Sequence, residues 1–268
     1  MIDLKQIEGF YPAPLRLFKA NLLREYFQHK ILEIIYDSKW SSHLVFMGGT
    51  SLRIVHSLNR FSEDLDFDNR GLKQKDFKEL TQCIAKKLKQ EGYAVDIKNV
   101  FKGAYHAHIG IADMLRKTGV SGHKQAKIMI RIDAQPQDFK YVPDQVLVNK
   151  FDVFLKINVV PPDILLAQKI YAIFNRKRPM GRDFYDTVFL LGRTKPNRNY
   201  LKAKLRIQTT AELKKKLLSR CRKLNFKQLA KDVEGFLINP GEAKKVLFFY
   251  EYIEGMRDLQ GPERGENA

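Results

Sequence analysis

An apolar run that ends in paired glycines and continues with two hydroxyl residues is the most restrictive feature of the sequence. The stretch HLVFMGG at 43–49 predicts a strand that runs into a tight turn at Gly48 and Gly49. The following TSLRIVHSL at 50–58 is typical of a helix, with Thr50 as its expected N-cap. Glycines let the backbone approach a ligand closely, and a helix N-terminus offers amide donors that suit phosphate.

Two acids follow this turn at a spacing of two residues. DLDFD at 64–68 alternates acidic and apolar residues, which favours a strand with Asp64 and Asp66 on one face. Two carboxylates on one face repel each other unless a cation lies between them. Magnesium prefers such oxygen ligands and is usually held by one or two carboxylates together with substrate phosphates. A phosphate cradle beside a carboxylate pair therefore predicts nucleotidyl or phosphoryl transfer.

A two-metal site would need a third carboxylate on a neighbouring strand. KIMIRID at 127–133 alternates, with isoleucines on one face and Met129, Arg131 and Asp133 on the other. Asp133 is therefore the candidate for a third metal ligand. His106 and His108 also alternate on an expected strand, but they lack Cys or Glu partners at ligand spacing, so they are not interpreted as a metal site.

The remaining pattern predicts an α/β (α+β) domain followed by a helical domain. Helices are expected at 13–37 and 75–90, and further strands at 93–100, 105–111, 127–133 and 154–160. Beyond them, helices are expected at 163–175 and 183–191, and the rest, 198–258, predicts several helices with breaks near 209–210, 225 and 239–241. We place the boundary so that the domains cover 1–160 and 161–268.

Composition narrows the classes of protein that the chain can be. Of 268 residues 44% are apolar, which excludes a mainly disordered chain. The two cysteines, Cys83 and Cys221, exclude a disulfide framework and a four-cysteine zinc site and indicate a reducing compartment, which we take to be the cytoplasm. No apolar span is long enough to predict a membrane protein.

The positive charge indicates a polyanionic partner. The formal net charge is +18, and residues 198–231 hold twelve Lys and Arg against one acid, Glu212. Such a one-sided segment predicts salt-sensitive contact with RNA through its backbone. Docking of an acidic protein, or solubility alone, are the alternative interpretations.

The ordered set of motifs resembles a known group. GGTSLR followed by SEDLDF is similar to the nucleotidyltransferase fold of the DNA polymerase β superfamily, and most similar to the AbiEii/AbiGii (MenT-like) toxin family. That family also has a later helix with a lysine and then an R-D-x-x-D helix. These correspond to LLAQKIYAIFNR at 165–176 and GRDFYDTVFLL at 181–191. The resemblance covers roughly a third of the chain.

The resemblance implies roles for individual residues. It implies Asp64 and Asp66 on the metal and Asp133 as a less regular third ligand, Lys169 as a phosphate-binding cation, and Asp183 as a second essential acid that either deprotonates the acceptor or orients Lys169. Arg60 is also expected at a phosphate, whereas Arg182 and Asp186 are expected to brace helices. The expected nucleotide-binding residues are Gly48, Gly49, Thr50, Ser51, Arg53, Ser62 and Lys169.

The resemblance further implies transfer of a nucleoside monophosphate from Mg-NTP to RNA, with the 3′ end of tRNA as the expected acceptor, and neutralisation by a cognate antitoxin. A helical domain that closes over the nucleotide is expected as well. Two alternatives stay open. The acceptor could be a protein serine, for example of the antitoxin, or the protein could bind RNA on a nucleotidyltransferase scaffold without catalysis.

Overall fold

A computed structural model describes residues 2–123 and 125–256 of the chain. The chain divides into two compact units, each taken by itself below. The first, the sheet unit, comprises the described residues of Met1–Ser57 and Phe61–Val159. The second, the helical unit, comprises Leu58–Arg60 and the described residues of Val160–Ala268. Residues 58–60 thus group with the helical unit, although they precede the expected boundary.

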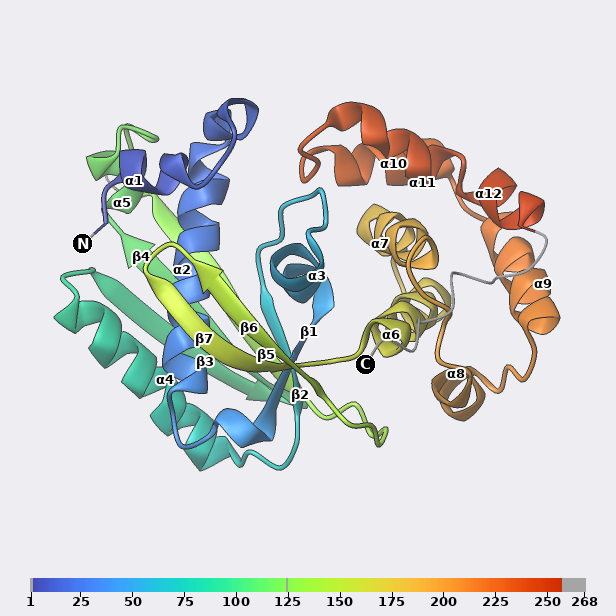
Figure 1. Ribbon diagram of the computed structural model, residues 1–268, viewed down its shortest axis with the longest axis horizontal. Coiled ribbons are helices and arrows are strands. Elements are labelled where there is room, and N and C mark those ends of the chain that lie inside the picture. Colours follow the sequence, from blue (N-terminus) through green and yellow to red (C-terminus); the bar gives the residue numbers. More distant parts are fainter. Residues whose placement is uncertain (1, 124, 257–268) are drawn as a thin grey trace. The chain divides into compact units, whose positions relative to one another are not determined.

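The sheet unit is built on a mixed sheet of seven strands in the order β3-β4-β5-β2-β1-β7-β6 (Figure 1). β2 pairs with β5 and β1 pairs with β7 in parallel, and the other neighbours are antiparallel. The strands are β1 (Leu44–Met47), β2 (Leu65–Asn69), β3 (Val95–Lys102), β4 (Ala104–Ala112), β5 (Lys127–Gln135), β6 (Asp144–Lys150) and β7 (Val153–Val159).

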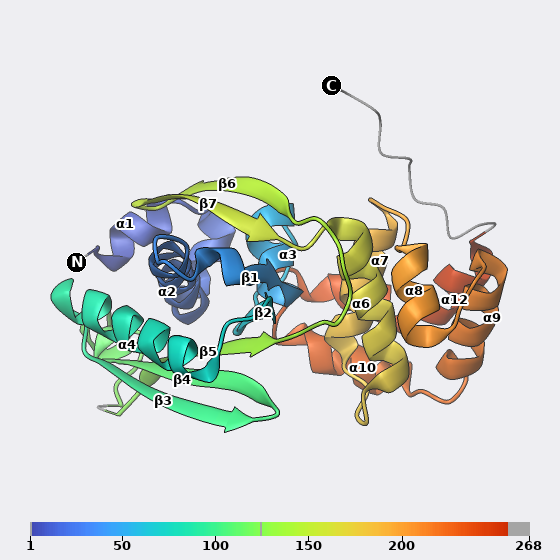
Figure 2. The ribbon, with the colours of Figure 1, turned by 90° about the horizontal axis from the view of Figure 1, so that it is seen from below.

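Helices cover the apolar side of this sheet. The long helix α2 packs against β5 and β7, and α4 packs beside α2 and against β3 (Figure 2). Alternate residues of the strands, such as Phe67 and Ile132, are buried and form the core. The helices of this unit are α1 (Leu4–Gly9), α2 (Lys19–Tyr36), α3 (Gly48–His56), α4 (Gln74–Gln90) and α5 (Met114–Lys117), with 3₁₀ turns at Ala13–Leu17 and Ser41–His43.

The helical unit has the breaks expected from capping residues. Thr209, Asn225 and Asn239 each accept a hydrogen bond from a backbone amide two or three residues later, which begins a new helix or turn. Its elements are α6 (Pro162–Asn175), α7 (Gly181–Leu191), α8 (Arg198–Leu205), α9 (Thr210–Cys221), α10 (Phe226–Glu234), a 3₁₀ turn Pro240–Ala243, α11 (Lys244–Leu247) and α12 (Phe249–Gly255).

Three local expectations were wrong. The expected helix at 13–37 is a 3₁₀ turn followed by α2. α3 begins at Gly48 with Met47 as its N-cap residue, so Thr50 lies inside the first turn and is not the cap. β6 was not predicted at all. Within the described residues no helix is long and apolar enough to cross a membrane.

The sheet unit's first long helix, α2, carries a buried histidine. His29 of α2 is 1% exposed, its Nδ1 lies 2.7 Å from the backbone oxygen of Glu25, and its ring meets that of Phe151 edge-on. Burial lowers the pKa of His29 to about 4, although the adjacent Glu25 favours the charged form. At neutral pH the ring is therefore uncharged, and Nδ1–H donates to Glu25.

We expect this histidine to make the sheet unit less stable in mild acid. The unfolded chain takes up a proton near pH 6.5, whereas the folded protein does so only near pH 4, so the free energy of unfolding falls as the pH drops between these values. His29→Phe keeps the ring contact with Phe151 and should flatten this part of the pH profile. Denaturant unfolding at pH 7 and pH 4.5 measures it; an equally steep fall in the variant would contradict the assignment.

Candidate active site

The candidate carboxylates lie on the polar face of two adjacent parallel strands. Asp66 of β2 is in register with Asp133 of β5, and Leu65 is in register with Ile132. Asp64 immediately precedes β2, so it continues this alignment towards Arg131. Leu65 and Ile132 are buried in the core. Because adjacent residues of a strand point to opposite sides, Asp66 and Asp133 lie on the opposite, polar face of the sheet. Acids distant in sequence are thereby brought together.

The glycine turn is packed directly against one of these acids. Gly48 has φ +79°, a conformation that side chains rarely adopt, and a Cβ there would overlap the carboxylate of Asp66 and lie 2.9 Å from its Cβ. Glycine is therefore required at position 48 for two reasons: the positive φ of the backbone, and the lack of room for a Cβ beside Asp66. The close approach places the carboxylate of Asp66 at the N-terminus of α3.

The first turn of α3 presents its backbone rather than its hydroxyl groups. Thr50 and Ser51 are both 0% exposed. Thr50 Oγ1 donates to the backbone oxygen of Asp64, which links the helix to the carboxylate segment. Ser51 Oγ is buried without a hydrogen-bond partner among the described residues. A phosphate at this turn would consequently meet backbone amides, as helix N-termini allow.

Two other predicted nucleotide-binding residues lie in the sheet unit. The Nε of Arg53 is 3.0 Å from Oε2 of buried Glu25, and its guanidinium lies over the ring of Phe61. Burial opposes ionisation of Glu25, but the charges of Arg53 and Lys150 outweigh it and lower its pKa to about 2. The backbone oxygen of Ser62 accepts a hydrogen bond from the side chain of a residue in α2.

Arg131 and His106 complete the polar face. The Nη2 of Arg131 lies 2.8 Å from Oδ2 of Asp64 and 2.9 Å from Oδ2 of Asp133. His106, directly opposite Asp133 on β4, has its Nδ1 2.6 Å from Oδ1 of that carboxylate. Both oxygens of Asp133 are thus engaged, one by a histidine and one by the arginine.

The donor set fits a magnesium ion. Among the described residues no three His, Cys, Asp or Glu side chains stand as a ready-made metal cluster. One nitrogen atom of Arg131 nevertheless contacts oxygens of both Asp64 and Asp133, so these two carboxylates lie within reach of a single cation. With Asp66 in register beside Asp133, the three carboxylates offer the hard oxygen ligands that Mg²⁺ prefers.

The helical unit holds a second cluster of charged side chains. Lys169 Nζ of α6 lies 3.2 Å from Oδ1 of Asp183 and 2.8 Å from Oδ2 of Asp186, both on α7. Arg60 donates to both oxygens of Asp186 at 2.7 Å, in a fully buried pair. Arg176 Nε lies 2.8 Å from Oδ2 of Asp183. The structure thus brings Lys169 and Asp183 together.

Opposite charges outweigh burial in this cluster. Burial opposes ionisation of Asp186, but Arg60 and Lys169 lower the pKa of that carboxyl below its usual range. Burial also opposes ionisation of Lys169, but the charges of Asp186 and Asp183 outweigh it and raise the pKa of Lys169 above its usual value. The amine therefore stays charged. Arg60, expected at a phosphate, is instead enclosed with Asp186, because the segment 58–60 packs in the helical unit.

A family model described as nucleotidyl transferase AbiEii toxin, type IV TA system, matches residues 30–245. The chain belongs to the AbiEii toxin family. This confirms the family inferred from the glycine, carboxylate, lysine and R-D-x-x-D motifs. AbiEii proteins are nucleotidyltransferase toxins of type IV toxin–antitoxin systems, which is the coarse function of this chain.

Solved structures agree with the AbiEii fold. A Helicobacter pylori protein provisionally described as a nucleotidyltransferase has a TM-score of 0.55 at 17% identity, covering 87% of this chain and 94% of its own. The structure of JHP933 from Helicobacter pylori has a TM-score of 0.53 at 16% identity, covering 87% of this chain and 91% of its own. The expected α/β fold is confirmed. No curated protein matches the chain.

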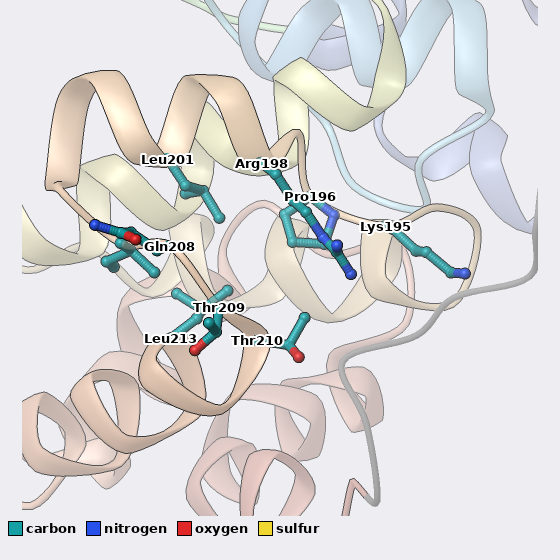
Figure 3. A pocket seen from close by; sticks show the side chains of 9 residues that line it. Lys195, Pro196, Arg198, Leu201, Gln208, Thr209, Thr210 and Leu213 are labelled. Atoms are coloured by element: carbon teal, nitrogen blue, oxygen red, sulfur yellow. The ribbon is translucent and has the colours of Figure 1, made fainter.

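The basic segment of this AbiEii protein lies on the surface of the helical unit. Of its twelve Lys and Arg none is buried. Figure 3 shows a small pocket at the beginning of α9, which is lined by Lys195 and Arg198 and by the apolar side chains of Leu201 and Leu213. Its lining contains no acid, so it adds to the positive surface rather than forming a second carboxylate site.

Sequence reasoning missed three residues of the two clusters. It gave no role to Arg131, dismissed His106 as a metal ligand without considering it as a partner of Asp133, and assigned Arg60 to a phosphate. Arg131 and His106 could have been found by extending the strand alternation across β4 and β5, once the register was known. Nothing local in the sequence indicates that Arg60 pairs with Asp186.

Proposed function

We propose that the protein transfers a nucleoside monophosphate from Mg-NTP to RNA, and that the acceptor is the 3′ end of a tRNA. The observation that carries this proposal is the packing of the Asp66 carboxylate against the glycine turn at the start of α3, on a face shared with Asp64 and Asp133. Such a site can hold a phosphate and a cation side by side. Family membership supports the reaction class.

The chain's residues have separate roles in this reaction. Asp64, Asp66 and Asp133 would hold magnesium, which supplies charge stabilisation on the transferring phosphoryl group when it is bound. Amides of Gly48, Gly49 and the first turn of α3 donate to phosphate oxygens. The acceptor hydroxyl oxygen bonds to the α-phosphorus, the bond from that phosphorus to the β-phosphate oxygen breaks, and pyrophosphate leaves with release of the hydroxyl proton.

The paired residues of the helical unit have the two remaining roles. Lys169 supplies a cation to the phosphates, as the family resemblance implies. Asp183 is ion-paired to both Lys169 and Arg176, and this double pairing favours an orienting role over that of a base. The exposed basic segment 198–231 supplies the charge that binds the RNA backbone.

We further propose a cognate antitoxin as a protein partner and the cytoplasm as the location. Both proposals rest on membership of a toxin–antitoxin family and on the two free cysteines. Many of the basic side chains are solvent-exposed, so an acidic antitoxin surface could compete with RNA for them.

The test incubates purified protein and Mg²⁺ with each labelled NTP and total cellular RNA, and sequences RNA 3′ ends afterwards. We expect untemplated nucleotides at tRNA 3′ ends with one or more NTPs, and none with Asp64→Asn protein. Label on protein instead of RNA would replace the RNA acceptor by a protein side chain. Absence of any label, together with unchanged toxicity of Asp64→Asn in cells, would contradict the enzymatic function.

A further inference from the structure

One arginine lies between two of the candidate metal ligands. Arg131 extends from the same face of β5 as Asp133, two residues earlier, and its Nη2 contacts both Asp64 and Asp133. The guanidinium thus stands between two of the three neighbouring carboxylates of the polar face. Arg131 therefore acts as a counter-ion for the carboxylates in the absence of metal.

The contacts of Arg131 can be broken easily. Its side chain is 43% exposed, and Asp64 is 34% exposed, so both groups can be solvated when they separate. Exposed ion pairs of this kind are weaker than buried ones because water competes for both groups. By contrast, Arg53 is paired with a Glu25 side chain that is 4% exposed, and such a pair has no comparable route to solvent.

A divalent cation has the advantage over Arg131 at these oxygens. It brings two charges in a smaller volume, and it approaches carboxylate oxygens more closely than a guanidinium nitrogen does. The guanidinium cannot lose its proton, so it can leave only by rotating away. His106 holds the other oxygen of Asp133, Oδ1, and keeps that carboxylate oriented meanwhile.

We propose that Arg131 competes with the divalent cation for Asp64 and Asp133 and is displaced from both when the cation binds. This inference rests on the proposed function, because it takes these acids as metal ligands. Arg131 thereby sets how tightly the site holds metal before the nucleotide arrives. It stabilises the metal-free protein and weakens metal binding by the same contacts.

The test measures binding of Mn²⁺ alone, without nucleotide, by electron paramagnetic resonance of the free ion. Arg131→Gln removes the competing charge, and we expect about tenfold tighter Mn²⁺ binding, equivalent to ~1.4 kcal/mol. Arg131→Lys keeps the charge and should stay close to wild type. In EDTA, Arg131→Gln should melt at a lower temperature than wild type, and added Mn²⁺ should restore it.

Lys127→Gln is a matched control for the loss of charge. Lys127 lies on the same face of β5, is 41% exposed and pairs at 2.8 Å with Asp96, away from the candidate ligands. It stands four residues from Arg131, roughly 13 Å along a strand, which exceeds the screening length at physiological salt. We expect this variant to bind Mn²⁺ as wild type does.

Two results would overturn the proposal, and they differ in what they leave standing. Equal Mn²⁺ affinity in wild type and Arg131→Gln, with nucleotide transfer intact, would refute the role of Arg131 alone. Absence of Mn²⁺ binding in every variant, up to millimolar concentration, would refute the metal site and the proposed function with it.

Discussion

Replacing Asp66 by asparagine is expected to reduce nucleotide transfer by about 10³-fold or more, ~4 kcal/mol of transition-state stabilisation. The side chain is nearly isosteric, so it can keep its place against Gly48, whereas its negative charge is lost. Asp68, the next acid on this face of β2, is 4% exposed and accepts hydrogen bonds from the Gln137 amide and the Tyr141 hydroxyl, so we do not expect it to replace the lost charge. Single-turnover labelling of RNA with saturating Mg-NTP measures the effect.

Folding must be separated from catalysis in this experiment. Removing one of three neighbouring acids relieves repulsion, so we expect the melting temperature of Asp66→Asn to be unchanged or higher. Asp96→Asn is the matched control, because Asp96 is an exposed acid on β3 of the same sheet, paired with Lys127. Its activity should equal that of wild type. Transfer by Asp66→Asn within tenfold of wild type would show that this acid is not a metal ligand.

Much of the sheet unit could be predicted from local pattern. The alternation of acids and apolar residues in β2, and of isoleucines with polar residues in β5, indicated both strands and the face that Asp133 occupies. β6 was missed because its pattern, DQVLVNK, has a weak apolar face. Leu147 of this edge strand is 63% exposed, so the strand lacks the regular alternation of apolar and polar residues that a half-buried strand shows.

The sequence predicted which acids belong to the site better than it predicted the contacts that those acids make. Whether Arg131 or His106 meets Asp133 depends on which strands are neighbours and on their register, and a sequence alone does not state either. The start of α3 shows the same limit. Thr50 has the chemistry of an N-cap, but the conformation of Gly48 allows the N-cap to lie three residues earlier, at Met47.

The charged cluster of the helical unit depends on a long-range packing event. Arg60 lies between the glycine turn and β2 in sequence, yet its backbone bridges to Leu237 and its side chain is enclosed with Asp186. No periodicity relates positions so far apart. The place of Asp186 on an R-D-x-x-D helix was enough to predict a structural role for it. Its partner, Arg60, could be identified only from the folded structure.

Replacing Asp186 by asparagine is expected to lower the free energy of unfolding of the helical unit by about 3–5 kcal/mol. Asp186 is fully buried, binds Arg60 through both oxygens and is one of two acids paired with Lys169, so its loss removes counter-charge from buried Arg60 and from Lys169. Asp183→Asn should cost less stability, because its partner Arg176 is 53% exposed and can be solvated. Denaturant unfolding followed by far-ultraviolet circular dichroism compares the two variants.

The same carboxyl predicts how this stability depends on pH. Because Arg60 and Lys169 lower the folded-state pKa of Asp186, its contribution is complete above the unfolded-state value near 3.8 and is lost as the pH falls below it. Asp186→Asn should therefore lack this part of the acid transition. Lys216→Gln, which removes an exposed partner of Glu212, is the surface control and should unfold as wild type does.

A double variant decides whether unpaired charge is the cause. In Arg60→Met/Asp186→Leu both members of the bidentate pair are replaced by apolar side chains, and Lys169 keeps Asp183 as its partner. If the cost of Asp186→Asn comes from the counter-charge lost beside buried Arg60, the double variant should be more stable than that single variant. If it is less stable instead, the pair itself, and not the charge left behind, holds the segment 58–60 in the helical unit.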